Sequence, residues 1–196
     1  MANNALGELT RLSGGQWDGE NVHNGPPGHY GDTDGEYQAA SHCAALRDAS
    51  HWTRLHISGA DHLDFLHRMS TSHFNNMEAG QGREAVFTEN RGRILDLCTF
   101  YCGENRSLAV FSPSSRESIP AWLDRFIFTE AIELRDLTDD TAMFELIGPQ
   151  ASALVQQVIG VDLQTLPAHQ LLIKEAKDDL WLATMPWGNN PGLRVA

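Results

Sequence analysis

Asp96 is the residue whose type and position most directly suggest chemistry. It lies within the apolar stretch Ile94–Cys102, which is rich in aliphatic, aromatic and threonine residues and has the composition of a β-strand. Because strand side chains alternate in direction, Asp96 should point the same way as Ile94, Cys98 and Phe100. A carboxylate on an apolar face is costly unless it is paired or used. In a cavity, it could accept a hydrogen bond from a ligand amine or move a proton.

Two arginines precede this strand in the sequence Arg91-Gly92-Arg93. They could be the solvated cations of a tight turn, or they could offer a guanidinium group to an anionic ligand. An ion pair between Asp96 and either arginine would give the carboxylate a purely structural role, as would a position at the rim of the sheet. The residue types alone leave the structural and the ligand-binding interpretations open.

The sequence lacks the spacings typical of metal, hydrolase and nucleotide sites. Two helical metal ligands need to be three or four residues apart, whereas five successive histidines are separated by five or six residues (His51, His56, His62, His67 and His73). No Gly-x-Ser-x-Gly motif, Gly-x-Gly-x-x-Gly motif or P-loop occurs. We therefore predict no metal site, no serine hydrolase and no nucleotide-binding loop.

Short strands joined by tight turns, with helices inserted between them, must position Asp96. Apolar patterns and composition predict strands at residues 53–58, 84–88, 94–102, 107–111, 131–134, 142–147, 171–173 and 180–184. Helices are predicted at 36–46, from 61 onward, after 114–117 and at 149–159. Gly103-Glu104-Asn105 should close a hairpin between the strands on either side of it. This order indicates an α+β fold with a mainly antiparallel sheet and inserted helices.

Two of the predicted helices carry specific end signals. Ser114-Ser115-Arg116-Glu117 has the pattern of a capping box, in which a serine hydroxyl and the glutamate satisfy each other's backbone donors. The helix behind it has an apolar stripe formed by Ile119, Trp122, Leu123 and Phe126. The later helix has Pro149 in its first turn, Gly160 at its end, and a stripe formed by Ala151, Leu154, Val155 and Val158.

Length and charge narrow the possible functions. The 196 residues suffice for one large or two small domains, and 14 basic against 26 acidic side chains give a net charge of −12. Nucleic acid is a poor partner for such a chain, because phosphate binding draws on clustered lysine and arginine. No apolar run reaches the ~18–20 residues of a membrane span, and the first residues do not resemble a secretory signal. We expect neither nucleic acid nor a membrane as a partner.

Residues 1–35 differ from the rest of the chain in composition. They are rich in glycine, asparagine and aspartate, and we expect an irregular arm there, followed by one folded domain over residues 36–196. The cysteines are Cys43, Cys98 and Cys102, and the last two should lie ~13 Å apart along one strand, beyond disulfide reach. Small buried thiols indicate a reducing compartment, and we expect a cytoplasmic protein.

Five motifs in a fixed order resemble those of a known protein family. The first is an entry segment formed by Gly31-Asp32 through Glu36-Tyr37 and by Ala45-Leu46-Arg47-Asp48-Ala49-Ser50-His51. The others are the stretch Ile57-Ser58-Gly59-Ala60-Asp61 with Asp64-Phe65-Leu66 and Ser70-Thr71, the turn Gly80-Gln81-Gly82, the segment Arg91-Gly92-Arg93-Ile94-Leu95-Asp96, and the segment Leu146-Ile147-Gly148-Pro149-Gln150-Ala151. They resemble the N-terminal half of the folate-binding superfamily that joins the T-protein of glycine cleavage, an aminomethyltransferase, with the YgfZ-type proteins.

The resemblance implies a ring of small α+β units around a cavity that holds tetrahydrofolate. Asp96 matches the aspartate that faces the reactive amine edge of the folate in the aminomethyltransferases, so it is our candidate catalytic residue and a candidate cofactor-binding residue. Ser112 and Ser115 match two asparagines of that branch and could hydrogen-bond the ligand, although Ser115 could instead cap its helix. Arg93, which stands where the family has a glycine, is the fourth candidate for contact with the cofactor.

Some positions depart from the aminomethyltransferase pattern. The second acid of that branch is Leu97 here, and an aromatic residue of that branch is replaced by Glu84. Its Thr-Gly-Tyr-Thr-Gly-Glu stretch is replaced by Trp187-Gly188-Asn189-Asn190-Pro191-Gly192-Leu193. Leu97 and Arg93 favour the YgfZ-type branch, which is associated with folate-dependent upkeep of iron–sulfur enzymes. Family members are considerably longer, so we expect this chain to be C-terminally incomplete.

Three functional hypotheses are consistent with these residues. The first is a tetrahydrofolate-binding YgfZ-like protein of one-carbon metabolism and iron–sulfur protein maintenance, with an iron–sulfur client protein as its partner. The second is an enzyme, an aminomethyltransferase that moves a one-carbon unit from a lipoyl-bearing protein to tetrahydrofolate. The third is an interaction protein that keeps the fold and has lost the ligand. Whether the chain is an enzyme stays open at this point.

Overall fold

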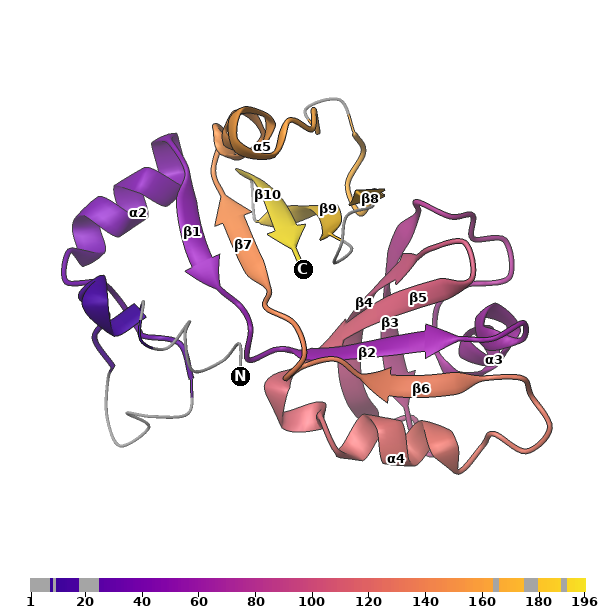
Figure 1. The fold of residues 1–196 in the computed structure, drawn as a ribbon. Helices are drawn as coiled ribbons and strands as arrows, with labels where there is room; N and C mark the ends of the chain where they lie inside the picture. Colours follow the sequence, from indigo (N-terminus) through magenta and orange to yellow (C-terminus); the bar gives the residue numbers. More distant parts are fainter. Residues whose placement is uncertain (1–7, 9, 18–24, 164–165, 175–179, 188–189) are drawn as a thin grey trace.

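Within the residues that the computed structural model describes (8, 10–17, 25–163, 166–174, 180–187 and 190–196), the strands form two antiparallel five-stranded sheets (Figure 1). The first sheet has the order β1 (Ala45–Asp48), β7 (Phe144–Ile147), β10 (Asn190–Val195), β9 (Leu180–Trp187) and β8 (Leu171–Lys174). The second has the order β3 (Gly82–Thr88), β4 (Ile94–Cys102), β5 (Arg106–Phe111), β2 (Thr53–Ser58) and β6 (Glu133–Asp136). One continuous stretch, residues 53–136, thus builds the second sheet and is inserted between β1 and β7 of the first.

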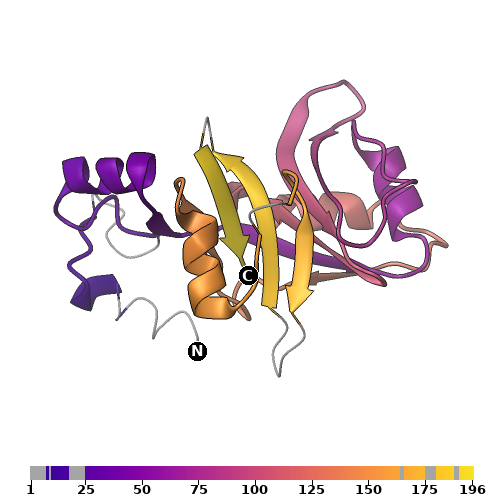
Figure 2. The ribbon, with the colours of Figure 1, turned by 90° about the horizontal axis from the view of Figure 1, so that it is seen from above.

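Helices pack against both sheets. In the second sheet, α3 (His62–Met69) and α4 (Ser118–Asp124) share an apolar cluster with the strand face that carries Cys98 and Phe100. In the first sheet, α5 (Ala151–Ile159) contributes Ala151 and Val155 to a separate cluster, and Figure 2 shows α5 lying alongside the strands. The helix α2 (Thr33–His42) precedes β1, and the short 3-10 helix η1 (Pro113–Ser115) joins β5 to α4.

The two sheets are held together by apolar packing and by a buried polar network. Tyr101 and Leu108 of the second sheet share a cluster with Leu171 and Ala183 of the first. The polar network is centred on Arg194 of β10. Its guanidinium donates to the Glu145 carboxylate on β7 at 2.7 Å and, across the two sheets, to the Tyr101 hydroxyl on β4 at 3.3 Å. The relative placement of the sheets is therefore fixed by side chains as well as by the connecting segments.

The predicted α+β architecture with mainly antiparallel pairing is confirmed. β2 and β4 begin and end at the predicted residues, and the β4–β5 hairpin and the β8–β9 pair form as expected. β6 and β7 each begin two residues later than predicted. The turn expected at 175–179 lies outside the described residues.

The helix predicted at 36–46 is wrong at both ends. It begins earlier, at Thr33, where the Asp32 side chain accepts a hydrogen bond from the Gly35 N–H at 2.9 Å. It ends at His42, and residues 45–48 form β1, which pairs with β7. Strand pairing with a segment far along the chain has overridden the local helix preference of the alanine-rich sequence.

The predicted capping box does not form. Pro113–Ser115 makes η1 instead, and α4 begins after Glu117, whose side chain makes no capping hydrogen bond. The predicted apolar stripes are only partly buried. In α4, Ile119 and Leu123 are buried in the apolar cluster against the second sheet, whereas Phe126, which follows the helix, is 40% exposed. In α5 the side chains of Leu154 and Val158 are likewise exposed.

Candidate functional site

Asp96 is buried near the start of β4, on the face that packs against the helices. The residue is 9% exposed, and Cys98 and Phe100, the following residues of the same face, are fully buried. The expected inward direction of Asp96 is therefore confirmed, but Ile94, expected on the same face, is 71% exposed. The pairing of β3 with β4 skips Leu95, and this irregularity interrupts the alternation ahead of Asp96.

The Asp96 carboxylate is held by three hydrogen bonds from the chain. Its Oδ1 accepts from the Leu97 N–H at 2.8 Å and from the Ser112 hydroxyl at 2.5 Å, and its Oδ2 accepts from the Ser112 N–H at 2.9 Å. An ionised carboxylate offers about four acceptor positions. Among the described residues, three of these are taken, which leaves one on Oδ2.

Ser112 is in turn fixed by its neighbours. Its backbone has φ −57° and ψ 150°, the extended conformation that a following proline favours, and Pro113 follows it. Its carbonyl accepts hydrogen bonds from the Thr53 hydroxyl at 3.0 Å and from the Ser115 N–H at 3.1 Å. The backbone N–H, carbonyl and hydroxyl of Ser112 all have partners within the chain.

The structure brings together two of the four candidate site residues in direct contact, Asp96 and Ser112. Ser115 lies three residues further along in η1, where it is buried and contacts Ser112 through its backbone. Arg93 lies in an exposed turn, with its side chain 77% exposed and 3.5 Å from the Glu89 carboxylate. Asp96 therefore receives its hydrogen bonds from Ser112 and from its own strand, and Arg93, which the sequence left open as an ion-pair partner, lies beside Glu89 instead.

Three positions that depart from the aminomethyltransferase pattern, Leu97, Glu84 and Trp187, are exposed. Leu97 is 50% exposed and projects from the face of β4 opposite to Asp96, where it pairs with Val86 of β3. An acid at position 97 would thus point away from Asp96. Glu84 is exposed on β3, and the Trp187 ring lies 5.3 Å from the Arg47 guanidinium. Residues 188 and 189 lie outside the described part of the chain.

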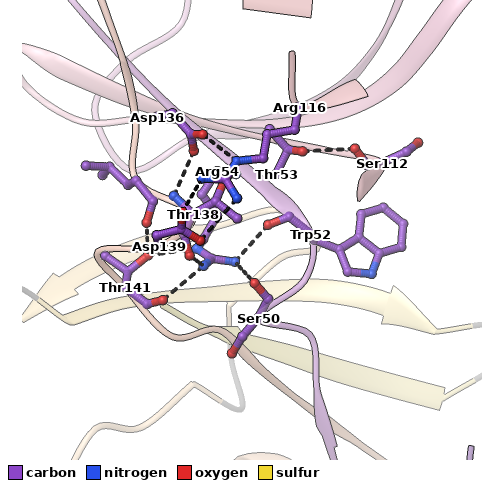
Figure 3. Close-up of polar contacts among 11 residues, drawn as sticks. Ser50, Trp52, Thr53, Arg54, Ser112, Arg116, Asp136, Thr138, Asp139 and Thr141 are labelled. Atoms are coloured by element: carbon purple, nitrogen blue, oxygen red, sulfur yellow. Dashed lines mark hydrogen bonds and ion pairs between the residues drawn. The ribbon is translucent and has the colours of Figure 1, made fainter. Parts of the chain in front are cut away.

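Arg54 is a buried charged residue near this site that the sequence did not reveal (Figure 3). It is 1% exposed, and its guanidinium donates to five neutral oxygens at 2.5–3.0 Å, which are the carbonyls of Ser50, Trp52, Thr138 and Thr141 and the hydroxyl of Thr141. Burial lowers the pKa of Arg54 to about 10, so the group stays charged at neutral pH. The alternating pattern of residues 53–58 predicts a half-buried strand, and nothing in it marks Arg54 as an inward-facing cation.

Arg54 forms hydrogen bonds with both of the segments that connect the two sheets. Its acceptors lie on the connection from β1 to β2 and on the connection from β6 to β7. Nearby, Arg116 donates to Asp136 at 2.6 Å and to Asp139 at 2.6 Å, which fixes the segment after η1 against β6. Figure 3 shows both arginines together with Thr53 and Ser112. The start of β2 is therefore anchored on several sides next to the Asp96 site.

A hollow lies on the face of the second sheet opposite to Asp96. It has a volume of about 350 Å³, and its lining includes His56, Arg106, Arg135 and Trp181. Burial lowers the pKa of His56, and the neighbouring Arg106 and Arg135 lower it further. Arg135 is paired with Asp140 at 2.9 Å, and the Arg106 guanidinium lies 5.6 Å from the Trp181 ring. Asp96 does not line this hollow.

The part of the chain that the structure describes contains neither a cluster of metal ligands nor a membrane-spanning helix. No group of three or more histidine, cysteine, aspartate or glutamate side chains is placed to hold a metal ion there. None of the described helices has both the length and the apolar character needed to cross a membrane.

The chain is similar in sequence to proteins named as transferases. It is 32% identical over 126 residues to the chloroplastic protein At1g60990 of Arabidopsis thaliana, which is named as a transferase, with 63% of this chain and 29% of that protein covered. It is 29% identical over 132 residues to an aminomethyltransferase of Bacillus cytotoxicus, with 67% of this chain and 36% of that protein covered. The chain thus spans about a third of the length of these relatives.

Solved structures share the fold. The glycine cleavage system aminomethyltransferase T from Bartonella henselae superposes with a TM-score of 0.84 at 22% identity, covering 97% of this chain and 52% of that one. Heterotetrameric sarcosine oxidase from Corynebacterium sp. U-96 matches with a TM-score of 0.58 at 15% identity, covering 96% and 82% of the two chains. The family model of the GCVT N-terminal domain matches residues 15–177. The chain therefore belongs to the GCVT N-terminal domain family.

Proposed function

We propose that this chain binds tetrahydrofolate at the Asp96–Ser112 site and serves as the folate-binding part of a YgfZ-like protein. The observation that carries the proposal is the Asp96 carboxylate, which is buried, oriented by Ser112, and left with one acceptor position on Oδ2 by the residues that the structure describes. The family membership supports the same ligand. Asp96 would accept a hydrogen bond from an N–H group of the folate, and Ser112 would hold the carboxylate in the direction of that group.

Tetrahydrofolate supplies the nitrogen atoms that carry one-carbon units. The chain would supply a buried carboxylate that holds, or takes up, a proton beside such a nitrogen. In the YgfZ-like role the bound folate would serve the maintenance of an iron–sulfur client protein in a reducing compartment such as the cytoplasm. The three free cysteines, two of them buried, are compatible with such a compartment.

An aminomethyltransferase is the second candidate function, and three observations favour it. Relatives named as aminomethyltransferases match the chain in sequence, and the fold of one such enzyme matches nearly the whole chain. In addition, Leu97 lies on the strand face opposite to Asp96, so its replacement of an acid leaves the surroundings of Asp96 intact. In this role a lipoyl-bearing protein would deliver the aminomethyl group, and the Asp96 carboxylate would accept the proton from the folate nitrogen that receives the one-carbon unit.

Calorimetric titration of the chain with tetrahydrofolate tests the proposal. We expect the wild-type chain to bind and Asp96→Asn to weaken binding by about tenfold or more, because a hydrogen bond to a charged acceptor is lost. Glu104→Gln is the matched control, since it removes one exposed carboxylate at the other end of the β4–β5 hairpin. Equal affinity of Asp96→Asn and wild type, or no heat with a folded wild-type chain, would contradict the proposal and favour the ligand-free interaction protein.

A second assay separates the two candidate functions. The chain would be given tetrahydrofolate and an aminomethyl group on a lipoyl-bearing protein, and methylenetetrahydrofolate and ammonia would be measured. Product formation that is lost in Asp96→Asn selects the aminomethyltransferase. Binding of tetrahydrofolate without product selects the YgfZ-like role.

A further inference from the structure

Thr53 supports the Asp96–Ser112 pair from the neighbouring strand. It is fully buried at the start of β2, opposite Phe111, the last residue of β5. Its hydroxyl donates to the carbonyl of Ser112 at 3.0 Å, a contact drawn in Figure 3. A threonine on the apolar face of this strand is thus used to hold the one residue that contacts Asp96 twice.

Ser112 transmits this contact because its own conformation decides where its donors point. The N–H and the hydroxyl that reach Asp96 belong to the same residue as the carbonyl that Thr53 holds. The other donor to that carbonyl is the Ser115 N–H within the turn of η1. Without the threonine hydroxyl, the carbonyl keeps only its contact with the Ser115 N–H, so the backbone of Ser112 is held less firmly on that side.

We propose that Thr53 is a positioning residue for the Asp96 carboxylate, acting through Ser112. Its hydroxyl fixes Ser112, and Ser112 aims the remaining acceptor position of Asp96 at the ligand. The inference rests on the proposed binding of tetrahydrofolate. It assigns part of the ligand affinity to Thr53, which acts on Asp96 through Ser112. Thr53 itself would not touch the ligand.

Three variants isolate the role of the hydroxyl. Thr53→Val keeps the size and branching of the side chain and removes the hydroxyl, whereas Thr53→Ser keeps the hydroxyl. Thr184→Val is the matched control in the first sheet, because Thr184 is also a buried threonine whose hydroxyl donates to a carbonyl, that of Pro167, at 2.5 Å. The free energy of unfolding, the affinity for tetrahydrofolate and the amide proton shift of Ser112 would be measured for each.

We expect Thr53→Val to shift the Ser112 amide proton and to weaken tetrahydrofolate binding by about threefold to tenfold, as for the loss of one buried hydrogen bond. Thr53→Ser should restore both, and Thr184→Val should lose stability without losing affinity. An unmoved Ser112 amide proton in Thr53→Val, or equal affinity losses in Thr53→Val and Thr184→Val, overturns the proposal. If the wild-type chain does not bind tetrahydrofolate, the proposed function fails, and the Ser112 amide shift alone decides whether Thr53 positions this pair.

Discussion

Ser112 donates both its backbone N–H and its hydroxyl to the carboxylate of Asp96, although the two residues are 16 positions apart in the sequence. The contact joins the start of β4 to the end of β5, where the chain leaves the sheet for η1. It explains how a carboxylate is accommodated near an apolar face without an arginine. The contact also gives Asp96 a structural role. For any substitution of Asp96, the free energy of unfolding should therefore be measured together with ligand affinity.

Removing the Ser112 hydroxyl should lower stability while leaving the fold intact. Ser112→Ala loses the 2.5 Å hydrogen bond to Oδ1 of Asp96 but keeps the N–H contact to Oδ2. Because hydrogen bonds to charged groups contribute about 1.5–3 kcal/mol, we expect a loss in this range in the free energy of unfolding by urea. Ser114→Ala, at an exposed neighbouring serine, should change it by less than about 0.5 kcal/mol. Equal effects of the two variants would contradict the assigned hydrogen bond.

The Arg116 ion pairs should make stability depend on pH in the acid range. The Arg116 guanidinium lowers the pKa of Asp139, and for Asp136 the contacts from Thr138 and Arg116 outweigh burial, so that its pKa is lowered as well. Since both carboxyl pKa values are lower in the folded than in the unfolded state, the stabilisation is complete above the unfolded values of about 4 and is lost as pH falls through the folded ones.

Urea denaturation of Arg116→Gln over a range of pH tests this dependence. The free-energy difference between wild type and Arg116→Gln should be largest near neutral pH and should shrink as the pH falls below about 4. Arg125→Gln, at an exposed arginine on the same helical segment, should follow the wild-type pH dependence. A wild-type to Arg116→Gln difference that stays constant with pH would show that the ion pairs do not contribute.

Arg54 should be among the most costly residues to replace with an apolar one. Arg54→Met removes five donated hydrogen bonds and leaves buried carbonyls on both connections between the sheets without this partner. We expect a loss of about 3 kcal/mol or more in the free energy of unfolding. Arg125→Met provides the exposed comparison, with an expected change within about 0.5 kcal/mol. A small effect of Arg54→Met would mean that the guanidinium does not hold these segments.

The buried Arg194–Glu145 pair should be more costly to break than to replace. Arg194→Met leaves the Glu145 carboxylate buried with Arg47 as its remaining cation, at 3.3 Å, and we expect a loss of about 3–5 kcal/mol. Adding Glu145→Leu to this variant should recover a large part of the loss, because the uncompensated charge is then gone. A double variant that is no more stable than Arg194→Met, measured by urea denaturation, would contradict this account.

Local patterns were sufficient to predict the elements whose pairing partners are close in the sequence. The β4–β5 hairpin joins two strands across Gly103-Glu104-Asn105, so the strand pattern and the turn residues define it together. α3 follows Ser58-Gly59-Ala60-Asp61 and buries His62, Phe65 and Leu66, which lie three and four residues apart as on one helix face. The inward direction of Asp96 followed from strand alternation alone.

Features that depend on distant partners could not be predicted in this way. β1 is a strand because it pairs with β7 about a hundred residues later, and the division of the strands into two sheets has the same cause. The burial of Arg54 depends on carbonyls from two loops that meet only in the folded chain. The Asp96–Ser112 contact could not be predicted either, because Ser112 lies just beyond the end of β5, outside the paired residues that the hairpin pattern defines.

An amide NMR titration of the chain with tetrahydrofolate shows whether the ligand reaches Asp96, because Leu97 and Ser112 both donate backbone N–H groups to the Asp96 carboxylate. We expect these two amide resonances to move among the most strongly, and we expect both changes to be lost in Asp96→Asn. Unmoved Leu97 and Ser112 amides, with the ligand-induced shifts confined to the hollow around Arg106 and Trp181, would contradict this expectation.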